Sequence, residues 1–357
     1  SFDNRGSLFA THQADLSGAQ INNAGDVASD ALTLTGTELT NSGRIQAQAA
    51  ADMSVNTITI SAGGKLLSGE GMSLNVSSLQ NDGVVQGGSL NMTSDSVSNQ
   101  GTLYGLNGLT GRFSTELLNS GTALSNGALD LTAESMTNSG RIAGTTLSIT
   151  GSALSNSGLW QGEKGLSLTA DTLNTLEGSR TLSGGALSLL TGQLTTAGTW
   201  QSTQADITAD DWQNAGTFLS LGSLTGSISH SLTSSGDISS QEALSISAET
   251  LKNQGQLLSA SDVTLNGQAL DNQGILQGQT LALHQTSVNN SGTLTGLNGL
   301  TTGSSTLPLM RARVTAVSPP KELINTGSLL SDGALTLGSD SITNSGSPQG
   351  HDVTGGA

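Results

Sequence analysis

Leu39-Thr-Asn-Ser-Gly43 is the stretch that decides the fold, because the chain repeats it. Looser copies, in which an aliphatic residue precedes Asn-x-Gly, fill the sequence between the close copies. Aligned on its last glycine, the stretch returns every 18 to 20 residues, except for one gap of 35 residues between Gly292 and Gly327. The close copies begin at Met136, Leu154 and Ile342. Tandem repetition at this period indicates a repeat architecture rather than a set of globular domains.

Within one copy, apolar residues recur with a period of two. One lies two residues after the glycine, as Ile45 does, and an aliphatic pair such as Leu32 and Leu34 precedes the next Asn-x-Gly. A period of two is typical of strands. Each copy therefore holds about three short strands, which are too short to form a core of their own. We predict an all-β fold, a parallel β-helix of about 18 coils of 18–20 residues, in which each coil stacks on the next.

The Asn-x-Gly element is expected at the sharpest corner of each coil. Asn and Gly both tolerate the left-handed backbone conformation that a tight corner can require. Stacked Asn side chains can also hydrogen-bond from coil to coil as a ladder. The corner residues that we single out are Asn41, Gly43, Asn138, Gly140, Asn156, Gly158, Asn272 and Gly274.

A longer repeat is superimposed on the coils. The six spacings that follow Gly25 recur in the same order after Gly140, so residues 26–140 and 141–255 form two superunits. A partial third copy covers 256–346, and the whole chain, 1–357, is predicted to be one β-helix fragment. The 35-residue gap is then an ordinary coil with an insertion at about 304–320. This insertion contains Arg311 and Arg313, and it is either a tolerated surface loop or a contact for a partner.

Composition excludes several classes of partner. The net charge is −16 and the isoelectric point is near 4.3, which argues against nucleic acid or an anionic membrane surface as the main partner. No apolar run is long enough to span a membrane. The chain begins inside a repeat, so we interpret it as a piece of a longer protein. It lacks cysteine, which fits a protein exported as an unfolded chain and fits a cytosolic protein equally well.

Residues that could carry chemistry are scattered. Asp210-Asp211 is the only adjacent acidic pair, and the four histidines fall in different coils. We therefore expect no enzyme, no metal site and no cofactor. Trp160 and Trp200 occupy the apolar slot two residues after the corner glycine. They pack inside the coils or, alternatively, are exposed as a contact for carbohydrate or protein.

The Leu-x-Asn-x-Gly repeat, with its Ala/Gly-x-Leu-x-Leu strands, resembles filamentous haemagglutinin repeats over essentially the whole chain. These occur in large bacterial exoproteins exported by two-partner secretion, which include adhesins and the toxin exoproteins of contact-dependent growth inhibition. The resemblance implies a right-handed β-helix at the bacterial cell surface, outside the outer membrane. It implies a structural and adhesive filament segment that holds a receptor-binding or toxin region away from the producing cell. The implied partners are an outer-membrane transporter during export and a target-cell receptor or host surface, which is contacted through other regions or through the 304–320 insertion. The alternative is a β-helical carbohydrate-active enzyme or a phage-type fibre.

Overall fold

The computed structural model describes residues 1–303 and 321–356. The predicted insertion at 304–320, with Arg311 and Arg313, lies outside these residues. The described chain contains strands and turns but no helix, and so no helix that could cross a membrane. Its contacts group it into two units: one comprises Ser1–Thr172 with Gly178–Gly185, and the other comprises Leu173–Glu177 with the chain from Ala186 onwards.

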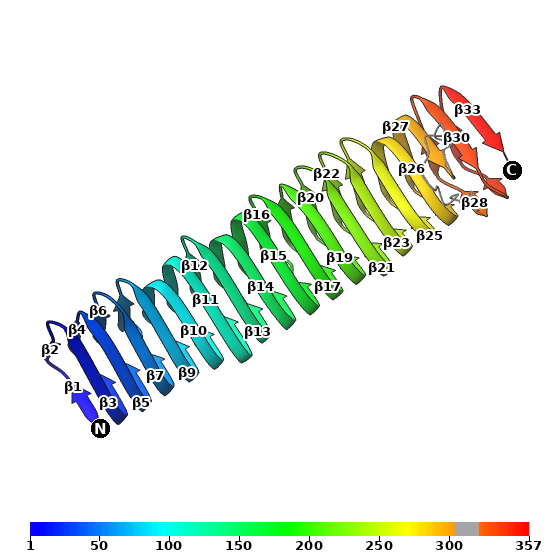
Figure 1. The fold of residues 1–357 in the computed structure, drawn as a ribbon. Coiled ribbons are helices and arrows are strands. Elements are labelled where there is room, and N and C mark those ends of the chain that lie inside the picture. Colours follow the sequence, from blue (N-terminus) through cyan, green and yellow to red (C-terminus); the bar gives the residue numbers. More distant parts are fainter. Residues whose placement is uncertain (304–320, 357) are drawn as a thin grey trace, which may run out of the picture. The chain divides into compact units, whose positions relative to one another are not determined.

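The first unit consists of stacked strands that follow one another along the chain (Figure 1). One strand, β15, ends in residues that belong to the second unit. The strands are β1 (Phe2–Asn4), β2 (Ser7–Phe9), β3 (Gln13–Asn23), β4 (Asp26–Ser29), β5 (Ala31–Asn41), β6 (Arg44–Ala47), β7 (Ala51–Ile60), β8 (Lys65–Ser68), β9 (Gly71–Asn81), β10 (Val84–Asn99), β11 (Thr102–Asn119), β12 (Thr122–Ser125), β13 (Ala128–Asn138), β14 (Arg141–Asn156), β15 (Leu159–Thr175) and β16 (Arg180–Ser183).

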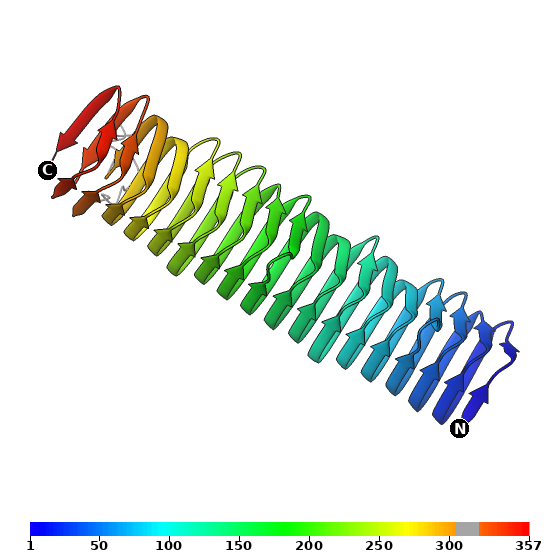
Figure 2. The ribbon, with the colours of Figure 1, turned by 180° about the vertical axis from the view of Figure 1, so that it is seen from behind.

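The second unit repeats the same arrangement, which the reverse view also shows (Figure 2). Its strands are β17 (Ala186–Thr196), β18 (Thr199–Ser202), β19 (Gln204–Asn214), β20 (Thr217–Ser220), β21 (Leu224–Ser234), β22 (Asp237–Ser240), β23 (Leu244–Asn253), β24 (Gln256–Ser259), β25 (Val263–Asn272), β26 (Ile275–Asn290), β27 (Thr293–Thr302), β28 (Glu322–Asn325), β29 (Ser328–Leu330), β30 (Ala334–Gly338), β31 (Ile342–Asn344), β32 (Ser347–Gln349) and β33 (Asp352–Gly356).

Strand pairing confirms the predicted parallel β-helix, or solenoid. Each strand pairs in parallel with the equivalent strand of the next coil, so that Leu34 of β5 lies opposite Met53 of β7 and Leu39 lies opposite Ile58. Like residues therefore stack on like residues from coil to coil. The backbone groups of one coil are paired by the coils on either side, which is how a solenoid satisfies strands that are individually short.

Many coils have one short strand and one long strand that turns a corner, whereas in β10, β11, β14, β15 and β26 the two are one continuous strand. In β13, alternate residues are buried up to Ala133, and the alternation then changes phase so that Met136 and Asn138 are buried. The phase change marks the corner between the second and third faces of the coil. Apolar side chains such as Leu129 and Leu131 fill the interior, while the residues between them face solvent. Burial of these aliphatic side chains is the main stabilising contribution of each coil.

Candidate functional site: a buried corner ladder and a surface polar network

The predicted corner asparagines line the inside of one corner. Asn41, Asn138, Asn156 and Asn272 are each the last residue of a long strand, and all four are 0% exposed. A buried amide must find partners for two donor hydrogens and for an acceptor oxygen, otherwise its burial is costly. Their partners are the same corner residues of the neighbouring coils.

In the first unit the amides form a directional ladder. Where the following coil also has Asn at this position, the Nδ2 group of one Asn donates to Oδ1 of the next: Asn119 to Asn138 at 2.7 Å and Asn138 to Asn156 at 2.8 Å. The same Nδ2 group of Asn138 also reaches the carbonyl oxygens of Gly140 and Leu159, both at 3.2 Å. Each rung therefore connects the side-chain ladder to the backbone of the turn beside it.

The corner glycines do not serve the purpose that the sequence suggests. Gly43, Gly140, Gly158 and Gly274 are not among the residues with positive φ, so the expectation of a left-handed corner is wrong for them. Glycine is required at these positions because the coils stack closely. A Cβ atom at Gly140 would lie 2.0 Å from the carbonyl oxygen of Gly121 in the preceding coil, and the distances at the other three are 2.0 to 2.1 Å. No side chain can be accommodated that close to a neighbouring backbone.

At the Asn-x-Gly corner of the described coils, positive φ occurs only where the Asn is replaced. Gly63 and Gly178 have φ of 84° and 82°, and they follow Ile60 and Thr175 at the ladder position. In the first of these corners the residue stacked against the next coil is Gly64, because a Cβ at Gly83 would lie 2.2 Å from the Gly64 oxygen. Such a turn contains one additional residue, and a left-handed glycine accommodates it.

The ladder is interrupted where a residue other than Asn occupies its position, as at Thr175, whose hydroxyl donates to the carbonyl oxygen of Ala197 rather than to the next rung. In the first unit Ile60 occupies the ladder position, between Asn41 and Asn81. In the second, Ser234 precedes Asn253. The Oδ1 atoms of Asn81 and Asn253 are buried without a hydrogen-bond partner in the described chain. Because an unpaired buried acceptor is destabilising, these are weak positions in the ladder.

Two tryptophans are connected to the ladder where threonine replaces asparagine. Nε1 of Trp200 donates to Oγ1 of Thr175 at 3.0 Å, and Nε1 of Trp212 donates to Oγ1 of Thr196 at 2.9 Å. Both indoles contact Phe218, with centroid distances of 5.4 Å in a stacked and an edge geometry. Sequence reasoning missed this connection. The available signal was the coincidence of nearby tryptophans with the two consecutive corners that lack Asn.

The tryptophans are not a surface contact. Trp160 is 0% exposed and Trp200 is 1% exposed. The alternative that these indoles bind carbohydrate or protein is therefore corrected, because the slot two residues after the corner glycine faces the interior. Unlike Trp200, Trp160 has an Nε1 atom without a hydrogen-bond partner among the described residues.

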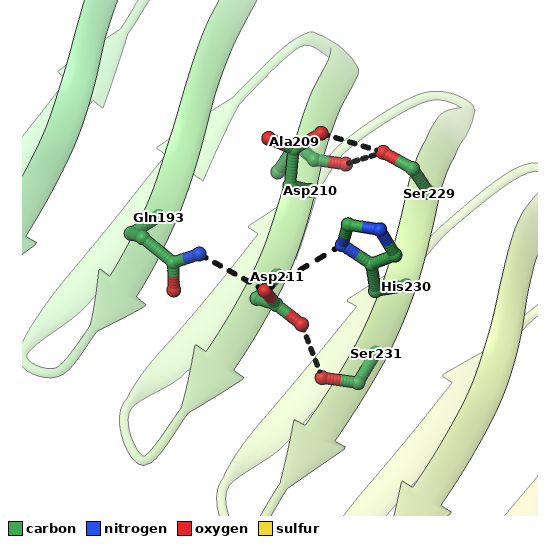
Figure 3. A network of polar contacts seen from close by, with 7 residues as sticks. All are labelled: Gln193, Ala209, Asp210, Asp211, Ser229, His230 and Ser231. Atoms are coloured by element: carbon green, nitrogen blue, oxygen red, sulfur yellow. Dashed lines mark hydrogen bonds and ion pairs between the residues drawn. The ribbon is translucent and has the colours of Figure 1, made fainter.

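The acidic pair at Asp210-Asp211 belongs to a polar network on the surface of the second unit (Figure 3). Asp211 accepts hydrogen bonds from Oγ of Ser231 at 2.6 Å and from Nε2 of Gln193 at 2.9 Å. Nδ1 of His230 lies 3.8 Å from Oδ2 of Asp211. The Ser231 and Gln193 hydrogen bonds, assisted by His230, hold the pKa of the Asp211 carboxyl below its ordinary value.

The neighbouring Asp210 accepts a hydrogen bond from Oγ of Ser229 at 2.7 Å. A matching contact joins Ser114 to Asp95 at 2.6 Å in the first unit. Asp95 and Ser114 each lie 115 residues before Asp210 and Ser229, and 115 residues is the length of the proposed superunit. In both places the strand register shifts beside the serine. The network thus occupies a bulged corner, and an equivalent corner is present in each of the two superunits.

Comparison with known proteins gives relatives of one kind. The chain is 39% identical over 267 residues to "tRNA nuclease CdiA" of Escherichia coli O6:K15:H31, across 74% of this chain and 8% of that protein. It is 37% identical over 235 residues to "16S rRNA endonuclease CdiA" of Enterobacter cloacae subsp. cloacae, across 65% and 7% of the two chains. It is 32% identical over 408 residues to "Deoxyribonuclease CdiA" of Dickeya dadantii, across 92% and 12%. No family model matches, and no solved structure matches.

The chain is a homologue of part of the CdiA exoproteins. Together with the solenoid fold, this confirms the resemblance to a filamentous haemagglutinin-like shaft of a two-partner-secreted exoprotein of contact-dependent growth inhibition. It also places the protein among secreted proteins of the bacterial cell surface. The chain spans about a twelfth of the length of the E. coli relative, since it aligns with 8% of it.

One expectation is overturned by the relatives. The sequence suggested a protein that is not an enzyme, because its carboxylates and histidines are scattered. The relatives, however, are named as a tRNA nuclease, a 16S rRNA endonuclease and a deoxyribonuclease. The exclusion of enzyme activity was therefore wrong for this class of protein. A repeat segment contains no information about the nuclease activity for which its full-length relatives are named.

Proposed function

We propose that this chain is a stalk segment of a large contact-dependent inhibition exoprotein, and that it sets the distance between the producing cell and the region that contacts the target. The observation that carries the proposal is the corner ladder. Buried amides and Cβ-free glycines repeat from coil to coil in both units. Such a construction stacks coils in fixed register and extends by adding more of them.

The whole protein is proposed to act as its relatives' names indicate, as a nuclease toxin on RNA or DNA that is delivered to a neighbouring cell. The partners in this proposal are an outer-membrane transporter during export and a receptor on the target cell. Superunits 26–140 and 141–255 support the stalk role, because duplication of a whole superunit lengthens a solenoid while it preserves the coil register.

An exchange of superunits tests the proposal in the full-length protein. In one variant residues 141–255 are replaced by a second copy of 26–140, which keeps the length and the register but changes the surface. In the other variant 141–255 are deleted. A stalk predicts that both variants are exported, that the exchange retains growth inhibition, and that the deletion reduces it. Loss of inhibition in the exchange variant, with export intact, would show that 141–255 has a specific role and would contradict a spacer.

A further inference from the structure

A surface groove crosses five successive long strands of the first unit, β7, β9, β10, β11 and β13. Its volume is about 570 Å³. Its floor is formed by the edges of Val55, Val76 and Phe113, which are otherwise buried. The groove lies at the bulged corner already described, where the hydrogen bond from Ser114 to Asp95 forms part of one wall.

Polar side chains flank this floor in two rows, with one side chain from each coil. The strand register places Ser54, Asn75, Thr93, Arg112 and Thr132 opposite one another along the first row. The second row lies on the other side of the floor, and each of its residues directly follows an inward-facing residue of its strand. It consists of Asn56, Ser77, Asp95 and Ser114. Equivalent groups thus recur at the coil spacing, about 4.8 Å.

Several of these polar groups have no partner in the described chain. The side chains of Asn56, Asn75 and Arg112 are exposed, and none of them makes a hydrogen bond or an ion pair with another described residue. Arg112 supplies the cation of the groove lining, and Asp95 supplies its anion. Arg112 and the two amides are therefore available to a ligand that carries hydroxyl groups and an acidic group.

We propose that the groove binds a linear glycan that carries acidic sugars at intervals. A sugar ring presents an apolar C–H face and polar edges, which matches an apolar floor between two polar rows. An extended peptide fits less well, because the backbone groups of β7, β9, β10 and β11 are already used in pairing between coils. Nucleic acid and uniformly charged polyanions are disfavoured by the charge of −16.

The second superunit offers a natural control. Counting 115 residues onward, Asn75 corresponds to Leu190 and Arg112 corresponds to Ser227, while the Asp–Ser contact is retained as Asp210 and Ser229. The double variant Asn75→Leu, Arg112→Ser therefore gives the groove the residues that the solenoid already uses at the equivalent positions. It removes an amide and a cation with little expected effect on folding.

Binding is measured by isothermal titration calorimetry of the 1–357 chain with three hexasaccharides. They are a hyaluronan fragment, with a carboxylate on every second sugar, neutral cellohexaose, and hexagalacturonate, with a carboxylate on every sugar. The hyaluronan fragment is expected to bind best. The double variant is expected to weaken its binding by about tenfold or more, the factor that one charge-assisted hydrogen bond supports. Arg44→Ser removes an exposed arginine outside the groove lining and is expected to leave binding unchanged.

Three results would overturn the proposal. They are the absence of binding by all three hexasaccharides, unchanged binding in the double variant with a native circular dichroism spectrum, and binding of an extended Ser/Thr hexapeptide in preference to the sugars. The proposal adds a ligand to the stalk and rests on the stalk role only for its biological setting. The two can fail separately, because the superunit exchange tests length and export whereas the calorimetry tests the groove alone.

Discussion

Two stretches of the buried corner meet the same requirement with different side chains. From Asn119 through Asn138 to Asn156, each of the first two amides donates to the next and still reaches a carbonyl oxygen of its own turn. From Thr196 through Asn214 to Ser234, hydroxyl groups replace two of the three amides. The hydroxyl of Ser234 donates to the carbonyl oxygen of Gly236, and Oδ1 of Asn253 in the next coil has no partner.

The difference follows from the number of donors. An amide carries two donor hydrogens beside its acceptor oxygen, so it can bond to the backbone and to the next rung together. A hydroxyl carries one hydrogen: at Ser234 the carbonyl oxygen of Gly236 accepts it, whereas at Thr196 the next rung, Asn214, accepts it. Threonine at Thr175 and Thr196 is compensated differently, because its oxygen also accepts a hydrogen bond from a tryptophan indole. An amide can therefore bond to its turn and to the next rung together, whereas a hydroxyl can donate to only one of the two.

The largest expected effect is that of a side chain at a stacked glycine. Gly140→Ala places a Cβ atom 2.0 Å from the Gly121 oxygen, a backbone atom that cannot move without shifting a coil. We expect a loss of about 3 kcal/mol in the free energy of unfolding, the upper range for overpacking. Urea denaturation followed by circular dichroism measures it. The control is Gly108→Ala, whose added Cβ meets only the Ala128 oxygen, at 3.8 Å. Equal stability of the two variants would contradict the stacking explanation.

Removal of one rung from the continuous stretch should cost somewhat less. Asn138→Leu keeps the approximate shape but removes the acceptor for Asn119 and the donor to Asn156. Both neighbours retain other contacts at the turn, so we expect a loss of about 2 kcal/mol. The same denaturation experiment measures it. Asn91→Leu, at an exposed position of β10, is the matched control and should change stability little. If both substitutions cost the same, the ladder contributes nothing specific.

The interrupted stretch can be repaired, which should stabilise the chain. Ser234→Asn supplies a second donor, which can reach the orphaned Oδ1 atom of Asn253. We expect a gain of about 1 kcal/mol, the net value of one hydrogen bond. Thermal unfolding should show a higher midpoint for this variant. The paired control Ser234→Val fills the site without a donor, and an equal or greater gain from it would indicate that packing rather than hydrogen bonding limits this corner.

The smallest effect is expected at the surface network. Because the pKa of Asp211 is lowered in the folded chain, its ionised form stabilises the fold above the ordinary carboxyl pKa, and the contribution is lost as pH falls through the lowered pKa. Asp211→Asn should therefore lower the free energy of unfolding at pH 7 only slightly. We expect a loss of no more than a few tenths of a kcal/mol, because solvent screens a partly exposed surface site. At pH 2 the two proteins should unfold together. A constant difference at both pH values would mean that charge is not the cause.

The sequence predicted the fold well because the solenoid depends on a local, repeated pattern. The alternation of residues such as Leu129 and Leu131 fixes which face is buried, and the period of the corner motif fixes the coil. The reason for Gly140 could not be predicted, because it depends on the distance between coils and not on local conformation. The indole partner Thr196 and the groove beside Arg112 depend on residues that only the stacked register brings together.

The corner asparagines form a continuous, buried ladder from Asn81 to Asn156. Nitrogen-15 labelling of asparagine alone, followed by NMR hydrogen exchange of the side-chain amides, tests it most directly. Nδ2 protons of Asn99, Asn119 and Asn138 should exchange only with unfolding of their coils, whereas those of exposed Asn56 and Asn75 should exchange at the rate of a free amide. Rapid exchange at Asn119 and Asn138 under native conditions, as fast as at Asn75, would contradict the account.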